Sequence, residues 1–318
     1  NDNETNVSKS GVTITQDLFD FEMSGPPLIP RHVFFGDAEV SMIQVSPCGN
    51  YVAYLAPSDD SPPAVFIRRL AGDSSPIPVT RHPEPVARFV WALPESDPKV
   101  IFAADFAGDE NFHVYVVDVN GILRDGADRA DAVKDLTPDV EGQHKARNLI
   151  ANLNPAHVDH VLVHSNARDV HREDVVMINL NSGRQEIIFQ NDEAYAWNVM
   201  VDASTHGRWE VHFRGRYTDM GGVFQLRDER GGWMVIENVD FQDMPSEHNP
   251  LTYRPLFVFN RDGSILWMTT AVGRDYHALQ KLDVLEARRD GMIWGPQKVI
   301  ENVYMPYAAV SFSGMASF

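Results

Sequence analysis

Residues 108 to 121, GDENFHVYVVDVNG, place two adjacent carboxylates, Asp109 and Glu110, beside Asn111 and before an aromatic-rich run. Two neighbouring carboxylates can accept hydrogen bonds from the free amine of a peptide, which would anchor a substrate. The same short polar side chains can instead bond to local backbone amides and form a turn between two strands. Asp109 and Glu110 are therefore candidate substrate-binding residues, and a structural turn is the competing interpretation.

Two further clusters carry residue types that bind metals, and neither has the spacing of a metal site. His157, His160 and His164 fall across a turn and a strand. On a strand, His160 and His164 would lie about 13 Å apart, too far to share one zinc ion. The acidic run from 125 to 131 lacks the later bidentate glutamate of a calcium loop and is predicted to be a solvated insertion in a hairpin. We therefore predict no metal and no other cofactor.

Covalent catalysis needs a nucleophile on a defined turn, and the sequence offers none. No G-x-S-x-G segment, the strand-turn-helix elbow that presents a catalytic serine, occurs in the 318 residues. The single cysteine, Cys48, lies in a tight turn without an adjacent base, so a nucleophilic role is not expected. We predict no catalytic residue in this chain.

The composition limits the class of partner and leaves the compartment open. Lys and Arg number 27 against 45 Asp and Glu, for a net charge of −18. This field repels phosphate backbones and anionic lipid, and there is no apolar run of about 18 residues, so neither nucleic acid nor a membrane is an expected partner. One cysteine excludes an internal disulfide. We expect a soluble protein, cytoplasmic or else secreted or periplasmic.

The elements that must position these residues are strands. Apolar runs of four to eight residues alternate with turn clusters, and helical periodicity is almost absent, which predicts an all-β chain. Two strands joined by a polar turn recur five times, at residues 43–57, 89–105, 149–166, 198–215 and 256–270. After each pair come a charged turn, a third strand and a fourth. An aspartate marks each charged turn: Asp60, Asp109, Asp169, Asp219 and Asp275.

Four antiparallel strands repeated at intervals of about 40 to 60 residues predict a β-propeller. A two-sheet sandwich ranks second, because it does not explain the grouping in fours. We expect an N-terminal extension at residues 1–36 and an incomplete propeller at 37–318, with five complete blades and the start of a sixth from a seven-bladed ring. The apolar segment 12–36 is expected to be poorly ordered or packed on another chain, and a homo-oligomer is an open option. Recurrence of the aspartate favours the turn interpretation of Asp109.

Three blade-like segments resemble a known family. Residues 27–57, with the turn Ser-Pro-Cys-Gly where the family has Ser-Pro-Asp-Gly, are similar to the first blade of prolyl oligopeptidase (S9) serine peptidases. GDENFHVYVVDVNG followed by KDLTP resembles the second blade, and NARDVHREDVVMINLNSG the third. The resemblance covers about residues 28 to 300 and is to the branch with acylaminoacyl and dipeptidyl peptidases.

The resemblance implies that this chain is the non-catalytic, substrate-gating propeller of a serine peptidase that hydrolyses short peptides. Its implied partners are those peptides and a C-terminal α/β-hydrolase domain with a Ser-Asp-His triad, which this chain lacks. Two alternatives stay open. The chain could be a stand-alone propeller scaffold for protein interactions, or an enzyme with its site in the central channel.

Overall fold

A computed structural model describes most of the chain between residues 40 and 290. The described ranges are 40–58, 61–72, 74–80, 82–93, 96–125, 133–153, 157–194, 196–202, 210–219, 221–240, 257–259, 264–270 and 278–290. The predicted N-terminal extension, the fourth strand of the fifth unit, the start of the sixth, and Asp60 and Asp275 lie outside these ranges.

The strands form consecutive antiparallel sheets, each made from one stretch of sequence. The first sheet contains β1 (Ser41–Val45), β2 (Tyr51–Ser58), β3 (Ser61–Arg69) and β4 (Ile77–Pro78), and the second contains β5 (Arg88–Trp91), β6 (Lys99–Ala104), β7 (His113–Asp118) and β8 (Val133–Asp135). The third contains β9 (Asn148–Asn152), β10 (His160–Asp169), β11 (Arg172–Asn179) and β12 (Gln185–Phe189). The fourth contains β13 (Ala196–Asp202), β14 (Glu210–Thr218), β15 (Gly221–Arg227) and β16 (Trp233–Asp240). The described part of the fifth contains β17 (Phe257–Phe259), β18 (Ile265–Thr270) and β19 (Ala278–Asp283).

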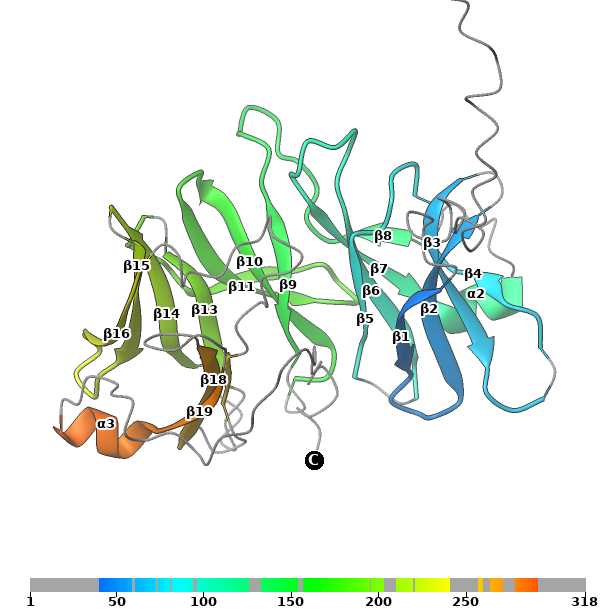
Figure 1. Ribbon diagram of the computed structural model, residues 1–318. Helices are drawn as coiled ribbons and strands as arrows, with labels where there is room; N and C mark the ends of the chain where they lie inside the picture. Colours follow the sequence, from blue (N-terminus) through cyan, green and yellow to red (C-terminus); the bar gives the residue numbers. More distant parts are fainter. Residues whose placement is uncertain are drawn as a thin grey trace, which may run out of the picture. The chain divides into compact units, whose positions relative to one another are not determined.

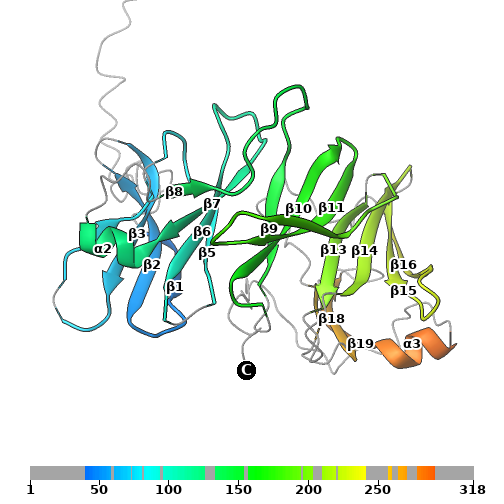
Figure 2. The same cartoon turned by 180° about the vertical axis from the view of Figure 1, so that it is seen from behind.

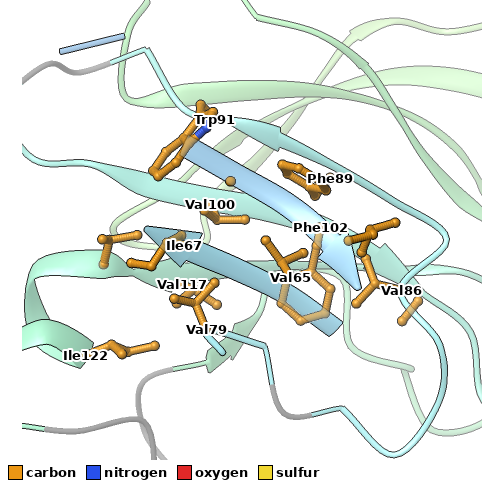
Figure 3. Packing of buried hydrophobic residues seen from close by; sticks show 14 residues of the cluster. Val65, Ile67, Val79, Val86, Phe89, Trp91, Val100, Phe102, Val117 and Ile122 are labelled. Carbon is orange, nitrogen blue, oxygen red and sulfur yellow. The ribbon is translucent and has the colours of Figure 1, made fainter. Parts of the chain in front are cut away.

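Strand β6 shows why its sequence, KVIFAA, is apolar almost throughout. Side chains alternate between the two faces of a strand, so Val100 and Phe102 point into the hydrophobic cluster shared with the first sheet (Figure 3). Ile101 and Ala103 belong to the cluster shared with the third sheet. Both faces of the second sheet are therefore buried, as in a sheet packed between two others.

Each hydrophobic cluster joins sheets that follow one another in the sequence. One cluster spans the first and second sheets, another the second and third, and a third includes Leu162 and Val175 of the third sheet with Trp233 of the fourth. The last joins Phe213 of the fourth sheet to Leu266 of the fifth. Figures 1 and 2 show the first four sheets side by side in chain order, with β18 and β19 beside the fourth. The predicted all-β architecture of four-stranded antiparallel units is confirmed, and its sheet order and packing are those of propeller blades.

The turn between β1 and β2 is the Ser-Pro-Cys-Gly segment singled out above. The Ser46 hydroxyl accepts a hydrogen bond from the backbone N–H of Tyr51 at 3.0 Å, and Gly49 N–H donates to the Ser46 carbonyl at 2.9 Å. Gly49 has a φ of 69°, which a residue without a side chain adopts at low cost. Cys48 is half-buried in this turn with its sulfur 3.3 Å from the Ser46 hydroxyl.

Two short helices were not predicted. Helix α2 (Val119–Asp125) follows β7 where a continued strand was expected, and α3 (Val284–Asp290) follows β19. Val119 and Ile122, three residues apart, bury themselves in the cluster between the first two sheets, and Val284 and Ala287 do the same beside the fourth sheet. Each helix is shorter than the window in which helical periodicity is detectable, so the preceding strand pattern concealed it. No helix among the described residues has the length and apolar character needed to cross a membrane.

The strand order fixes which segments share one end of the sheets. Four antiparallel strands in sequence order return the chain to the end at which it entered. The corners between second and third strands therefore lie at the same end as the connections between sheets. We call this the corner end. It includes residues 105–112, 136–147, 166–171 and 190–194.

Candidate functional site

Asp109 lies at the corner end, between β6 and β7, with both carboxylate oxygens engaged. Lys145 donates to its Oδ2 at 2.8 Å, and the backbone N–H of Asn111 donates to its Oδ1 at 3.0 Å. The hydrogen bond from Lys145 holds the pKa of Asp109 well below its usual range, with the Asn111 amide acting in the same direction. A peptide amine would have to compete with Lys145 for this carboxylate.

Glu110, the second candidate, is exposed and takes part in the same corner through its backbone. Its N–H donates to Asp105 Oδ2 at 3.0 Å, and its φ is 59°. Ala107 also has a left-handed φ of 59°, which costs energy for a residue with a Cβ atom and shows that the surrounding contacts fix this corner. The structure places both candidates in a turn of local hydrogen bonds. Their contact with a substrate stays a prediction.

The corner of the third sheet repeats this geometry. Asp169 Oδ1 accepts a hydrogen bond from the backbone N–H of His171 at 2.9 Å, two residues further on, as Asp109 does from Asn111. Its other oxygen pairs with Arg172, which takes the place that Lys145 has at Asp109. The recurring aspartate therefore caps a turn at Asp109 and at Asp169, as its periodicity indicates. Asp219, the third of these aspartates in the described residues, lies exposed in the turn after β14.

The histidines of the sequence hypothesis lie at the opposite end of the third sheet. His160 begins β10, with Nδ1 2.7 Å from an Asp159 carboxylate oxygen, and its ring centroid lies 6.0 Å from that of His157. His164 lies further along β10, opposite Val175. In the described ranges, no three His, Cys, Asp or Glu side chains gather as a metal site would require. Asp125 ends α2, and the rest of the acidic run lies outside the described residues.

A network of polar contacts anchors the connection between the third and fourth sheets. Arg168 donates two hydrogen bonds, at 2.6 and 2.7 Å, to the carboxylate of Asp174, which is 1% exposed. Asp174 also accepts from the backbone N–H of Asn191, and Arg168 donates to the Asn191 carbonyl, both at 2.8 Å. The buried Asn191 side chain then accepts from the N–H of Glu193 at 3.2 Å. These contacts fix where Glu193 leaves the third sheet.

Two arginines on β14 lie opposite the Glu193 carboxylate. Arg216 Nη1 lies 3.3 Å from one carboxylate oxygen and Arg214 Nη2 lies 3.8 Å from the other. Arg214 is fixed by a 2.9 Å hydrogen bond from its Nε to Gln225 Oε1, and its guanidinium lies 4.2 Å from the centre of the Trp233 ring. The Arg214 side chain is 8% exposed, whereas those of Arg216 and Glu193 are 37% and 40% exposed. We call these three charged residues the arginine cluster.

The electrostatics of the fourth sheet reflect its burial. Burial lowers the pKa of Arg214, and the nearby charges of Arg216 and Arg227 act in the same direction. Burial also raises the pKa of Glu237, on β16, to about 7. The guanidinium carbon of Arg227 also lies near the Trp233 ring, 5.8 Å from its centre, and it lies 5.5 Å from the centre of the Phe189 ring. The fourth sheet therefore holds several positive charges in a chain whose net charge is −18.

The arginine cluster can bind a charged group, and its residues include no nucleophile. Two guanidinium groups suit a carboxylate, whereas the carboxylate of Glu193 suits an amine. Sequence reasoning missed this cluster because it looked for acids at the corners. The available signal was the FRGRY segment, where Arg214 and Arg216 are two residues apart and hence on one face of a predicted strand.

No family model matches the chain. Over 269 residues it is 28% identical to dipeptidyl aminopeptidase BIII of Pseudoxanthomonas mexicana, a match that covers 84% of this chain and 35% of that protein. It is 25% identical over 165 residues to dipeptidyl peptidase family member 6 of Caenorhabditis elegans, covering 52% of this chain and 21% of that protein. The matches thus span about a third or less of these relatives.

Solved structures with the same kind of fold are distant. A puromycin hydrolase superposes with a TM-score of 0.49 and 14% identity, over 78% of this chain and 38% of that chain. The β-propeller domain of the Trilobed protease from Pyrococcus furiosus gives a TM-score of 0.44 and 12% identity, over 77% of this chain and 67% of that chain. Similarities at this level carry no argument about function.

Proposed function

Since the chain resembles the propeller of prolyl oligopeptidase (S9) family peptidases, we propose that it selects short peptides for a catalytic domain elsewhere in its parent protein. The observation that carries this proposal is the 28% identity over 269 residues to a dipeptidyl aminopeptidase. That match covers most of this chain and only 35% of the relative, which leaves room in a parent of similar length for an α/β-hydrolase domain. The proposed ring is seven-bladed, with five blades and the start of a sixth in this chain.

The topology supports one orientation for that catalytic domain. The chain enters β1 and leaves each four-stranded sheet at the corner end, so a domain attached there faces the corners. Phe106, Val140 and Val170 lie at this end with 62%, 56% and 57% of their surfaces exposed. Exposed apolar side chains grouped at one end are typical of a surface that another domain covers.

In this proposal the propeller acts by exclusion and by contact. The sheets block bulky substrates from the catalytic domain, and the charged residues of the corner end contact the terminus of a peptide that enters. The arginine cluster is better placed for this contact than Asp109, whose carboxylate Lys145 already holds. Peptide cleavage itself would take place through a serine ester on the parent's own triad.

An activity assay on the parent protein tests the proposal. The parent is expected to hydrolyse dipeptidyl or acyl-amino-acid nitroanilides, and an inhibitor that acylates catalytic serines is expected to abolish turnover. The scaffold alternative predicts no inhibitor-sensitive hydrolysis of any of these substrates, and that result would refute a peptidase role.

The selection role needs a separate measurement. Peptides of increasing length that carry the same cleavable end should lose kcat/KM steeply once they no longer fit behind the propeller. A short fluorogenic peptide serves as the matched control for catalytic competence. Equal efficiency on short peptides and on a folded protein would show that the propeller does not exclude substrates.

A further inference from the structure

Arg214 is held in one orientation before any ligand arrives. Its Nε donates to Gln225 and its guanidinium lies over the Trp233 ring, so two independent contacts fix the plane of the group. Of the two remaining nitrogens, Nη2 lies 3.8 Å from the carboxylate of Glu193, which also pairs with Arg216. A guanidinium fixed in this way loses little conformational freedom when it binds a partner.

Glu193 lies between the arginines and accepts one long hydrogen bond, from Arg216 Nη1. Its carboxylate lies 3.3 Å from Arg216 and 3.8 Å from Arg214, whereas charge-assisted hydrogen bonds are about 2.7 to 2.9 Å long. By contrast, Arg168 and Asp174 pair at 2.6 and 2.7 Å in the same part of the chain. The contrast marks the Arg168 pair as a structural contact and the Glu193 contact as a loose one.

We propose that Arg214 and Arg216 form a binding site for the carboxylate of a peptide, and that Glu193 is an internal occupant which the peptide displaces. The inference rests on the proposed function for the identity of the ligand as a short peptide. It adds the class of group recognised, a carboxylate at the C-terminus or on an acidic side chain.

The anchoring of Glu193 permits this displacement. Its backbone stays fixed through Asn191, because the Asn191 side chain accepts the Glu193 N–H and its own backbone bonds to Asp174 and Arg168. Only the Glu193 side chain, 40% exposed, has to move. Arg216 is 37% exposed and gives the ligand access from solvent.

The charge of the rest of the chain directs an acidic ligand to the arginine cluster. The chain has a net charge of −18, so an acidic peptide is repelled from most of its surface. Arg214, Arg216 and Arg227 lie close enough for their charges to influence one another, which marks this region as an exception. A carboxylate ligand therefore has a defined place to bind, and salt should weaken its binding.

Three blocked dipeptides separate the possible recognition modes. Acetyl-Ala-Ala carries only a C-terminal carboxylate, acetyl-Ala-Asp-amide carries only a side-chain carboxylate, and Ala-Ala-amide carries only a free amine. Calorimetric titration of each into the full 318-residue chain measures affinity without any requirement for catalysis. Binding of the first probe alone assigns the site to a C-terminus, and binding of the second alone assigns it to acidic side chains.

Substitutions in the arginine cluster give the decisive result. Glu193→Gln removes the negative charge of the occupant and should tighten binding of the carboxylate probes about tenfold, whereas Arg216→Gln should weaken it about tenfold. Arg216→Lys keeps the charge without the planar fork and should fall between wild type and Arg216→Gln. Glu186→Gln and Arg184→Gln, at exposed positions on or beside β12, change charge equally and should leave affinity unaltered.

The opposite pattern would overturn the proposal. If Glu193→Gln weakens Ala-Ala-amide and leaves acetyl-Ala-Ala unchanged, Glu193 accepts an amine and the arginines only hold it in place. Failure of all three probes to bind also refutes the site, provided that the chain shows a cooperative thermal transition. Neither result bears on serine-dependent hydrolysis by the parent, so the proposed function stands or fails separately.

Discussion

The interface between the first and second sheets and that between the third and fourth are built from different materials. The first is a cluster of aliphatic and aromatic side chains, with Phe89 and Phe102 fully buried (Figure 3). The second contains Leu162 and Val175 beside Trp233, and there Arg214 lies over the indole ring. The same blade packing thus accommodates a hydrocarbon layer in one place and a charged, hydrogen-bonded layer in another.

The two materials suit different tasks: apolar side chains stabilise an interface, whereas oriented charged side chains can recognise a ligand. Apolar burial is nondirectional and contributes about 25 cal/mol per Å² removed from water, so the first interface stabilises without selecting any ligand. A buried guanidinium costs desolvation energy and recovers it only through oriented partners such as Gln225 and Trp233. Between the third and fourth sheets, the buried Arg214 carries this desolvation cost at the place where we propose that a ligand carboxylate binds.

The largest effect is expected from breaking the apolar interface. Phe102→Ala should lower the free energy of unfolding by about 3 to 5 kcal/mol, because Phe102 is fully buried and stacks on Tyr115 at 4.9 Å. Phe106→Ala, four residues away at an exposed corner, is the matched control and should change it by less than about 0.5 kcal/mol. Urea titrations measure both variants. Equal effects would show that the first interface is not tightly packed.

A smaller effect is expected at the polar interface. Arg214→Ala should lower the free energy of unfolding by about 2 kcal/mol, since it removes the contact with Trp233 and leaves the Gln225 side chain without its hydrogen-bond donor. Arg214→Met keeps the volume and should recover most of that loss, because hydrophobic replacements of buried charges are often neutral. Chemical denaturation compares the pair. Equal losses in both variants would mean that Arg214 stabilises the fold through its charge.

Glu237, in the fourth sheet, should make the stability of the protein depend on pH. Its folded pKa of about 7 lies above the unfolded value of 4.5, so the folded state binds more protons between these values and loses stability as the pH rises through them. Glu237→Gln removes the cost of ionisation and should stabilise the protein by on the order of 2 kcal/mol at about pH 8. At about pH 4 the two proteins should unfold alike. Unfolding midpoints at both pH values test this, and a pH-independent difference would contradict it.

The smallest effect is expected between the third and fourth strands of the second sheet, β7 and β8. His113 lies between two carboxylates, with Nδ1 2.8 Å from Asp135 and Nε2 3.3 Å from Asp139. Both nitrogens can donate only in the charged imidazolium, and the hydrogen bond to Asp135 raises the pKa of His113 although burial opposes it. The contribution to stability is therefore full below the unfolded pKa of about 6.5 and is lost as the pH rises through the folded pKa.

His113→Gln should accordingly cost about 0.5 to 1 kcal/mol under acidic conditions and less under alkaline ones. Thermal unfolding as a function of pH measures the difference. His171→Gln, at an exposed corner, provides a control for loss of an imidazole elsewhere. A cost that grows with pH would show that His113 acts as a neutral group.

Most strands were predictable, because side-chain alternation and turn residues are local properties of the sequence. The predicted turn at Ser46 to Gly49 and the recurring aspartate cap at Asp169 are examples. Helix α2 was not predictable, since its two buried residues, Val119 and Ile122, acquire meaning only from the adjacent sheet. The arginine cluster depends on a contact between residues 193 and 216, from separate elements, and no single segment encodes that proximity.

The even number of strands in each complete sheet has a consequence for how such a molecule can change. Because four antiparallel strands bring the chain back to its starting end, inserting or deleting a whole sheet preserves the polarity of both attachment points. A single added strand would reverse it and send the following segment to the far end. Duplication in units of one sheet is therefore the modification that changes the number of sheets and leaves the polarity of both attachment points unchanged.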